Sequence, residues 1–364
     1  MVTVRIRAER DELADVFSRA SRAVGLRPAQ PILQGVLCET IGSKLRVTGT
    51  DLEATIRTTA EVDVQEEGRV VVPGRLATEA IRKMPEGVVV IEAGDGEIAI
   101  TGRGPRFSLR ELSVADYPEL GEPNLEGSVT VAGDALGEAI AQVGIAASGD
   151  AARPILTGVL FEPGEEGLRL VATDSYRLAV REIQGFVLRD AGLVPAKGLK
   201  ELSRAIGATQ IQVAVGTREI VFGSERGSLT LRLIEGNFPN YRQLLPESHP
   251  NRLVVEKEHL LEALDRAGLV AEDHIPVRIK MMEGGAEMTV TRQDVGGEVE
   301  HINGTFEGDA DEVLIAFNPR YLSEGVAAIA GDQVQLQVMD GLKPAVLKGV
   351  GDDSFLYLLM PVRI

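Results

Sequence analysis

Residues of the types that most often carry out catalysis are few in this chain, and their spacing fits no catalytic motif. The four histidines are His249, His259, His274 and His301. They do not have the paired spacing of a metal site, and the chain contains no GxxxxGKS/T, HExxH, GxSxG or CxxC motif. We therefore expect no metal, no cofactor and no catalytic residue. An enzyme, with Asp174 and Arg177 as its least poor candidates, ranks third among the possible functions.

Three aspartates recur at the end of one repeated segment, at Asp51, Asp174 and Asp294. A residue that recurs in all three copies is more simply explained as capping a turn than as performing chemistry three times. The single cysteine, Cys38, lies between apolar neighbours in a predicted strand. We expect it to be a small core residue rather than a nucleophile.

Basic residues recur on two predicted helices at equivalent places in the repeats. The first set is Arg75, Arg82 and Lys83 against Glu79, and the second is Lys197, Lys200 and Arg204 against Glu201. Their helical spacing places each set on one face. Solvated Lys and Arg side chains would explain either helix alone, whereas recurrence favours a surface that faces a polyanion.

The elements that position these residues come in three tandem copies. The segment PILQGVLCETIGSKLRVTGTD ends at Asp51, PILTGVLFEPGEEGLRLVATD ends 123 residues later at Asp174, and the weaker IPVRIKMMEGGAEMTVTRQD ends at Asp294. Each copy has the pattern β-α-β-β-β taken twice, with two helices against antiparallel sheet. The sequence therefore predicts an α+β fold of three domains, about 1–125, 126–250 and 251–364.

The first copy illustrates the expected elements. Helices are predicted over about 11–24 and 74–84, and strands over 2–6, 32–39, 44–49, 52–64, 69–72, 88–93, 97–102 and 105–112. Tandem domains leave an open sheet edge at each end, and open edges invite pairing with another chain. Head-to-tail contacts between identical chains form a ring if the rotation closes.

Composition narrows the class of protein. A chain of 364 residues is too long to fold around a single hydrophobic core, so we expect more than one domain. One cysteine excludes internal disulfides, and neither a signal-peptide pattern nor a long apolar run is present. We expect a cytoplasmic protein that does not bind membranes. The net charge of −17 by itself argues against nucleic acid, so the distribution of charge has to decide.

Four segments carry a family resemblance: PILQGVLCE followed by LRVTGTDLE, ATDSYRLAV, GNFPNYRQLLP at 236–246, and the terminal LMPVRI. The combination of ATDxxRLA, FPxYR and a terminal MPxRL/I resembles the bacterial DNA sliding clamp, the β subunit of DNA polymerase III, over the whole chain. The resemblance implies a head-to-tail homodimeric ring of six domains, with helices inside, sheets outside and duplex DNA in the hole. It also implies a processivity factor without catalysis, since ATP hydrolysis belongs to a separate clamp loader.

The resemblance and the basic helix faces together predict sequence-independent contacts with double-stranded DNA. The expected residues are Arg27, Arg82, Lys83, Arg153, Lys197 and Arg204. Contacts to phosphates alone carry no sequence information, which allows a ring to slide. Ala196 stands where some relatives have a further basic residue.

The resemblance further implies a hydrophobic pocket that captures short peptides from the DNA polymerase III alpha subunit, the clamp loader, other polymerases and repair proteins. The matching residues are Leu156, Thr173, Ser175, Tyr176, Arg177, Leu178, Pro239, Leu244, Leu358, Met360, Pro361 and Val362. Tyr176 and Gln243 stand where relatives vary. The alternative for the terminal segment is simply a last strand with a frayed end.

The residues matching the family's dimer interface are Phe107, Leu109, Leu269 and Val270. Ordinary core packing is the alternative explanation for these four. The runner-up function is a repeat scaffold that binds peptides but not DNA.

Overall fold

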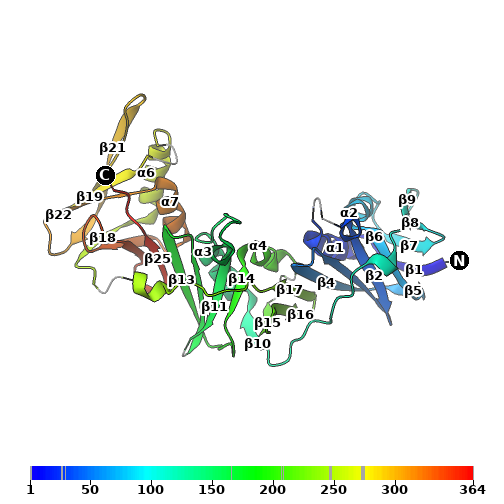
Figure 1. Cartoon of the computed structure of the whole chain (residues 1–364). Coiled ribbons are helices and arrows are strands. Elements are labelled where there is room, and N and C mark those ends of the chain that lie inside the picture. Colours follow the sequence, from blue (N-terminus) through cyan, green and yellow to red (C-terminus); the bar gives the residue numbers. More distant parts are fainter. Residues whose placement is uncertain are drawn as a thin grey trace. The chain divides into compact units, whose positions relative to one another are not determined.

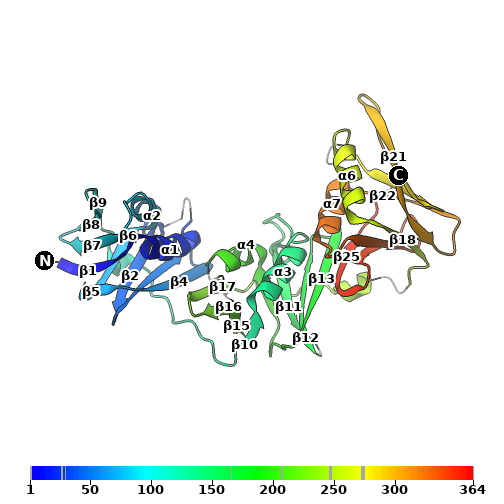
Figure 2. The same ribbon diagram turned by 180° about the vertical axis from the view of Figure 1, so that it is seen from behind.

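The computed structural model describes residues 2–25, 28, 30–164, 166–205, 207, 209–245, 248–271 and 275–363. The chain falls into two compact units, Met1–Gly137 with Leu188–Leu233, and Glu138–Val187 with Ile234–Ile364. The second sequence repeat therefore contributes to both units. Figures 1 and 2 show each unit as helices packed on antiparallel strands.

The first repeat lies in the first unit. Its elements are β1 (Val2–Glu9), α1 (Arg10–Ala20), η1 (Ser21–Ala23), η2 (Pro31–Gln34), β2 (Gly35–Ile41), β3 (Lys44–Thr50), β4 (Ala54–Glu61), β5 (Asp63–Glu66), β6 (Arg69–Pro73), α2 (Gly74–Arg82), β7 (Val88–Gly94), β8 (Glu97–Thr101), β9 (Arg106–Arg110) and η3 (Val114–Asp116). The two expected helices are confirmed. The expected strand at 32–39 begins only at Gly35, because Pro31 starts a 3-10 turn, and the expected strand at 52–64 is divided into β4 and β5.

Part of the second repeat completes the first unit. It contributes β10 (Val129–Ala132), β14 (Gly192–Pro195), α4 (Ala196–Leu199), α5 (Leu202–Ala205), β15 (Gln210–Val215), β16 (Glu219–Ser224) and β17 (Gly227–Arg232), while α3 (Gly133–Gly144) contributes to both units. The expected continuous helix with Lys197, Lys200 and Arg204 on one face is wrong, because α4 and α5 are separated by a turn. Gly198 is a poor helix former, and a Cβ there would lie 2.6 Å from Leu231 Cδ2.

The second unit holds the rest of the second repeat and the third. Its elements are η4 (Pro154–Thr157), β11 (Gly158–Pro163), β12 (Gly167–Thr173), β13 (Arg177–Gln184), η5 (Tyr241–Leu244), β18 (Asn251–Glu256), α6 (Lys257–Gly268), β19 (Val277–Met282), β20 (Gly285–Arg292), β21 (Gly296–Glu307), β22 (Glu312–Phe317), α7 (Pro319–Ala328), β23 (Gln333–Val338), β24 (Ala345–Gly349) and β25 (Asp352–Leu359). Helices α6 and α7 lie side by side, as α1 and α2 do (Figures 1 and 2).

Strand pairing joins each repeat to the next. In the first unit, two sheets have the orders β5-β1-β7-β8-β9 and β10-β15-β16-β17-β4-β3-β2-β6. In the second unit the order includes β11-β12-β13-β25-β24-β23-β18-β21-β20-β19-β22. The strand that follows Asp51, β4, pairs with β17, the last strand of the second repeat. The strand that follows Asp174, β13, pairs in the same way with β25, the last strand of the third.

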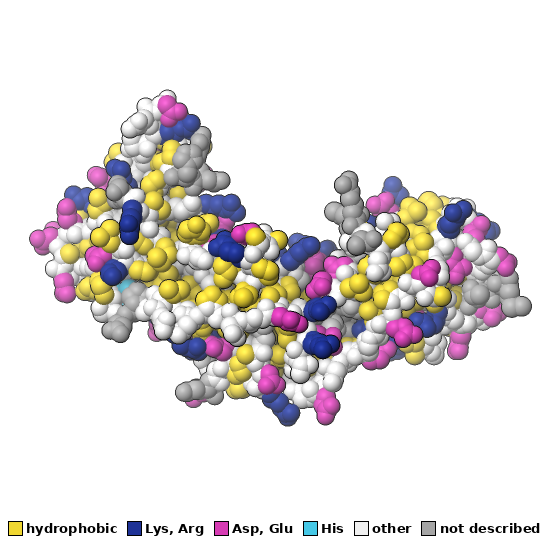
Figure 3. Space-filling view, viewed as in Figure 1, with side chains coloured by type: hydrophobic (Ala, Val, Ile, Leu, Met, Phe, Trp, Pro, Cys, Tyr) yellow, Lys and Arg dark blue, Asp and Glu magenta, His cyan; other side chains and the backbone are white. Residues whose placement is uncertain are grey.

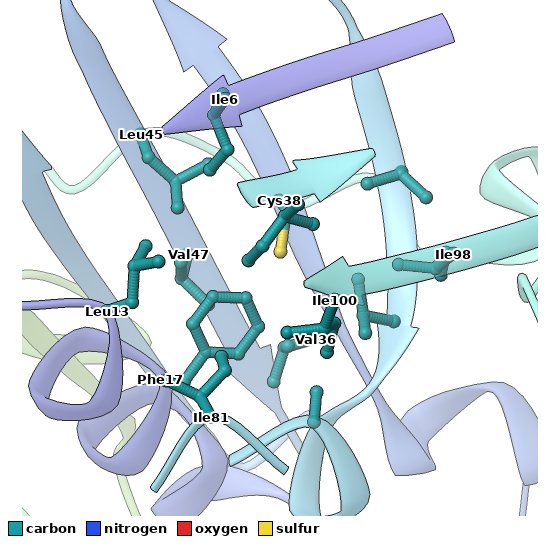
Figure 4. Close-up of a cluster of buried hydrophobic side chains, with 14 of the residues drawn as sticks. Ile6, Leu13, Phe17, Val36, Cys38, Leu45, Val47, Ile81, Ile98 and Ile100 are labelled. Atoms are coloured by element: carbon teal, nitrogen blue, oxygen red, sulfur yellow. The ribbon is translucent and has the colours of Figure 1, made fainter. Parts of the chain in front are cut away.

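The core of the first repeat is a cluster of aliphatic side chains around Phe17 and Cys38, shown in Figure 4. Leu13, Phe17 and Ile81 reach it from α1 and α2, and all three are fully buried. Cys38 is 3 % exposed, and burial raises the pKa of its thiol far above the ordinary value. The expectation that Cys38 is a core residue is confirmed. Among the described residues, no helix is long and apolar enough to cross a membrane.

Cys38 should therefore be inert to thiol reagents in the folded protein. Only the thiolate reacts, and both burial and the raised pKa suppress it. In native buffer at pH 8, DTNB should label no thiol over hours, and in guanidinium chloride it should label one at once. Rapid labelling of the native chain would contradict this packing.

Candidate peptide pocket, basic helices and open sheet edges

A tight turn after β12 organises the predicted pocket. Asp174 Oδ1 accepts hydrogen bonds from the backbone N–H groups of Tyr176 at 2.9 Å and Arg177 at 3.1 Å. Thr173 Oγ1 donates to the carbonyl of Arg177 at 2.7 Å. Ser175 completes the turn with a positive φ of 82°. Asp174 thus caps the turn, as predicted.

Asp51 caps the equivalent turn of the first repeat. Its Oδ1 accepts from the N–H groups of Glu53 at 3.1 Å and Ala54 at 2.7 Å. Asp294 lies in the corresponding turn of the third repeat and forms an exposed ion pair with Arg292 at 3.1 Å. The turn-capping interpretation is therefore confirmed for the first two repeats.

Arg177 is a buried anchor beneath this turn. Its guanidinium is paired with the carboxylates of Asp174, at 3.0 Å, and Glu324, donates to Tyr357 Oη at 3.3 Å, and lies 4.2 Å from the centre of the Tyr321 ring. Burial opposes the charged form, but Tyr357 and Glu324 outweigh it and raise the pKa of Arg177. These contacts hold β13 against α7, which is a structural role.

The C-terminal segment lies beside the same turn. After β25 pairs with β13, the N–H of Met360 donates to the carbonyl of Tyr176 at 2.9 Å, and the N–H of Val362 donates to the carbonyl of Ala316 at 2.8 Å. The last-strand part of the alternative is therefore confirmed, since β25 ends at Leu359, whereas the end is hydrogen-bonded and not frayed as far as Val362.

The predicted pocket residues differ in exposure. Thr173, Arg177, Leu178 and Leu358 are buried, Leu156, Pro361 and Val362 are half-buried, and Ser175, Tyr176, Pro239, Leu244 and Met360 are exposed. Leu178 and Leu358 belong to an apolar cluster with Tyr241 and Val346. Exposed Tyr176 lies 6.4 Å from Tyr321, ring centre to ring centre. The turn and the terminus thus place exposed aromatic and thioether groups above an apolar floor.

Sequence reasoning missed the contacts that fix the loop after β17. Glu162 accepts from Tyr241 Oη at 2.7 Å and from Arg242 at 2.7 Å. Arg169 also pairs with Glu162, at 3.7 Å, and donates to Tyr241 Oη at 3.4 Å. The FPNYRQL motif therefore has a structural function, and the motif itself was the only available signal. Tyr321 and Glu324 were missed because nothing in the sequence links α7 to Arg177.

The basic residues of the predicted helices are on the surface. Arg82, Lys83, Lys197 and Arg204 are all exposed. Arg82 donates to Ser18 Oγ at 2.5 Å, so only part of its hydrogen-bonding capacity is used. The face in Figure 3 carries basic and acidic side chains in alternation with hydrophobic areas.

The other two residues predicted to contact DNA are Arg153 and Arg27. Arg153 forms an ion pair with Asp150 at 3.0 Å and reaches the carbonyl of Asp174 at 3.4 Å and Ser175 Oγ at 3.5 Å. It therefore lies beside the pocket turn. Arg27 lies outside the described residues.

The four predicted interface residues lie near two sheet edges. Phe107 and Leu109 are on β9, the edge strand of its sheet, and both pack on the core of the first repeat. Leu269 follows α6 directly and is 86 % exposed, and Val270 is half-buried. The core alternative therefore accounts for Leu109, which is 7 % exposed, and does not account for Leu269.

Comparison with known proteins gives a consistent result for all three repeats. Models of the N-terminal, central and C-terminal domains of the DNA polymerase III beta subunit match residues 4–121, 130–240 and 242–363. A beta sliding clamp of Streptomyces coelicolor is 35% identical over 99% of this chain and 100% of its own length.

Solved structures of bacterial sliding clamps have the same fold as this chain. The DNA polymerase sliding clamp of Bacillus subtilis is 25% identical, covers 100% of both chains and has a TM-score of 0.94. A Pseudomonas aeruginosa sliding clamp bound to griselimycin is 24% identical, also covers 100% of both chains and has a TM-score of 0.94, which shows the shared fold. The chain belongs to the DNA polymerase III beta subunit family, the bacterial sliding clamps, which are non-catalytic processivity factors of replication.

Proposed function

We propose that two copies of this chain close head to tail into a ring around duplex DNA and tether polymerases and the clamp loader through the pocket at Tyr176 and Met360. The observation that carries the proposal is the strand pairing between repeats. Each strand that follows a repeated aspartate pairs with the last strand of the next repeat. Among the described strands, residues 296–303 of β21 pair only with β20, and β9 pairs only with β8, so each of them leaves an open edge.

The two internal junctions predict the register of the third. Ile56 pairs with Leu229 and Ala179 pairs with Tyr357. Within their own hairpins, these two residues face Gly49 and Ala172. The equivalent residue of β20, Arg292, faces Gly296 because the third hairpin is three residues shorter, so Gly296 corresponds to Ile56 and Ala179.

The matching residue on β9 follows from its neighbouring strand. Leu109 pairs with Ile98 as Leu231 pairs with Ile220, so Leu109 corresponds to Leu231. Phe107 therefore corresponds to Leu229, and in an antiparallel pair between two copies Phe107 should face Gly296 and Ser108 should face Val295.

The proposed register joins the core faces of the two sheets. Phe107 packs on the core of the first repeat. Glu298 and Glu300 pair with the buried Val290 and Met288, so these positions of β21 are on the core face too. Glu298 Oε2 is buried without a hydrogen-bond partner among the described residues, and burial and the nearby Glu300 raise its pKa. In the proposed register Glu298 is opposite Pro105, with Arg103 and Phe107 two residues away on the same side.

Helix α6 extends this edge. Arg266 pairs with Glu300 on β21 at 2.6 Å, and Leu269 follows less than one turn later. The exposed Leu269 side chain therefore adds apolar surface beside the strand edge. We place Leu269 and Val270 in the interface with Phe107 and Leu109.

The substitution Leu269→Glu should shift the ring toward monomers, because it replaces the exposed apolar residue beside the strand edge by a carboxylate. The dimer dissociation constant should rise at least about ten-fold, which corresponds to a loss of about 1.4 kcal/mol of association free energy. Sedimentation velocity across a dilution series measures this constant. Leu342, which is 77 % exposed in the turn between β23 and β24, provides the control: Leu342→Glu should leave the dimer intact. Equal dissociation constants for the two variants would reject the interface at Leu269.

DNA contact is assigned to the exposed basic residues of α2, α4 and α5. A chain with net charge −17 that displays Arg82, Lys83, Lys197 and Arg204 on equivalent helices concentrates its positive charge where phosphates would pass. Arg27 belongs to the same set by resemblance alone. Arg153 is assigned to the pocket instead, because of its contacts with the 174–175 turn. The protein would act in the cytoplasm.

Replacing Arg82 and Lys197 by Gln should weaken duplex association and flatten its salt dependence. Each lost phosphate contact lowers the slope of log K against log salt by about 0.9. Fluorescence anisotropy with a labelled duplex at several salt concentrations measures the slope. The exposed Arg226 and Lys343 provide a charge-matched control, whose double Gln variant should keep the original slope. An unchanged slope in the first variant would show that these helices do not face DNA.

The pocket should bind an extended peptide with leucine and aromatic anchors. The substitution Met360→Ala should weaken such a peptide about ten-fold, since losing about 50 Å² of apolar contact costs about 1.3 kcal/mol at roughly 25 cal/mol per Å². Leu342→Ala, at a residue 77 % exposed, should have no effect. Deleting Met360–Ile364 should abolish binding and lower the melting temperature only slightly, because two backbone hydrogen bonds are lost. Retained binding by the deletion variant would refute the pocket.

A further inference from the structure

A polar cavity of about 320 Å³ lies where β4 meets β17, entirely within the first unit. Its lining includes Arg57, Arg218, Arg232, Glu53, Glu219 and Thr230. Thr58, the neighbour of Arg57 on β4, donates to the carbonyl of Val16 on α1. Because successive side chains of a strand point to opposite faces of the sheet, Arg57 and the cavity are on the face away from α1. Its volume is at the lower end of the range for ligand pockets, so it accommodates one or two side chains.

The position of this cavity corresponds to that of the peptide pocket. Thr55 pairs with Thr230 at the first junction as Leu178 pairs with Leu358 at the second. Each junction follows a turn capped by the repeated aspartate, with a non-glycine residue at positive φ. That residue is Leu52, at 74°, in the first turn and Ser175, at 82°, in the second. The backbone frame is therefore the same at both junctions.

The lining of the two sites differs in chemistry. Leu178 and Leu358 are replaced at the first junction by Thr55 and Thr230. By the same register, Arg57 stands at the position of Val180, and Arg232 at the position of Met360. A surface that is apolar at the second junction is thus polar and partly cationic at the first. The two sites should bind ligands of different chemistry.

Two polar side chains at the cavity, Arg57 and Thr230, can form further hydrogen bonds with a ligand. Arg57 is only 8 % exposed, and it donates to the carbonyls of Gly121 at 2.6 Å and Leu120 at 3.4 Å. Burial lowers its pKa and the nearby Arg46 adds to this effect, while the carboxylates of Glu122, Glu39 and Glu219 oppose it. Thr230 Oγ1 is buried with no hydrogen-bond partner among the described residues. Buried polar groups of this kind normally have partners.

From this arrangement we infer that the cavity is a second peptide site, selective for a short acidic segment whose carboxylate binds between Arg57 and Arg232 and accepts a hydrogen bond from Thr230. Three arginines outnumber two glutamates in the lining, on a chain with a net charge of −17. Arg232 lies 3.9 Å from Glu53 in an exposed ion pair, which an incoming carboxylate would replace. Leu52, 45 % exposed at the rim, offers apolar contact to a flanking residue. This site does not depend on the proposed function, because its residues lie apart from the pocket at Met360.

The test uses the full-length protein with labelled Leu and Thr methyl groups and two synthetic probes, acetyl-Gly-Glu-Leu-Glu-Gly-amide and its Gln counterpart. The acidic peptide should shift the methyl resonances of Leu52, Thr55 and Thr230 and reach saturation. The Gln peptide should bind at least about ten-fold more weakly, because charge-assisted hydrogen bonds are roughly twice as strong as neutral ones. The same shifts should persist after deletion of Met360–Ile364.

Three variants sharpen the test. Thr230→Val should preserve or raise the melting temperature, because the hydroxyl has no partner to lose, and should weaken the acidic peptide about five-fold. Arg232→Gln should also weaken it, whereas Arg226→Gln, on the neighbouring turn, should not. Three results would each overturn the acidic-peptide site. They are a lack of saturable shifts at millimolar acidic peptide, equal affinity for the Gln peptide, and equally tight binding of inorganic phosphate.

Discussion

Backbone pairing between the strand after each repeated aspartate and the last strand of the following repeat is the interaction on which the rest of the structure depends. It brings together segments far apart in sequence, such as the turn at Tyr176 and the terminus at Met360, whose backbones are hydrogen-bonded at 2.9 Å. It also explains why the compact units do not coincide with the sequence repeats. Among the described residues, β9 and residues 296–303 of β21 each have a neighbouring strand on one side only, and both edges are satisfied if two chains form a ring.

The repeats share a backbone and differ in the side chains at their junctions. Asp51 and Asp174 cap the same turn with the same acceptor atom. Beyond the turn, Thr55 occupies the place of Leu178. The two junctions therefore differ in the chemistry of a few side chains on two paired strands, while the hydrogen-bonding frame stays constant.

Local and repeated features could be predicted from the sequence. The helix at 74–84 has a clear periodicity, the aspartate turns recur at Asp51 and Asp174, and Cys38 has apolar neighbours, so each of these was identified correctly. Features that depend on contacts between distant parts of the chain could not be predicted. The pairing of β13 with β25 and the ion pair of Arg177 with Glu324 have no periodic signal. The break between α4 and α5, at the turn of Lys200 and Glu201, does not follow from the helical spacing of the basic residues. The proposed domain limits of 1–125, 126–250 and 251–364 stay predictions.

Closure of the ring through β9 and β21 is the central claim, and disulfide cross-linking tests it most directly. Facing residues of an antiparallel pair have Cα atoms about 4.5–5.5 Å apart, within the range of a disulfide. A chain with Ser108→Cys and Val295→Cys should oxidise quantitatively to a covalent dimer, because Cys38 is buried and does not compete. The same chain should stay monomeric on a denaturing gel if the register is wrong, and efficient cross-linking only of a Cys pair shifted along the strands would contradict the account.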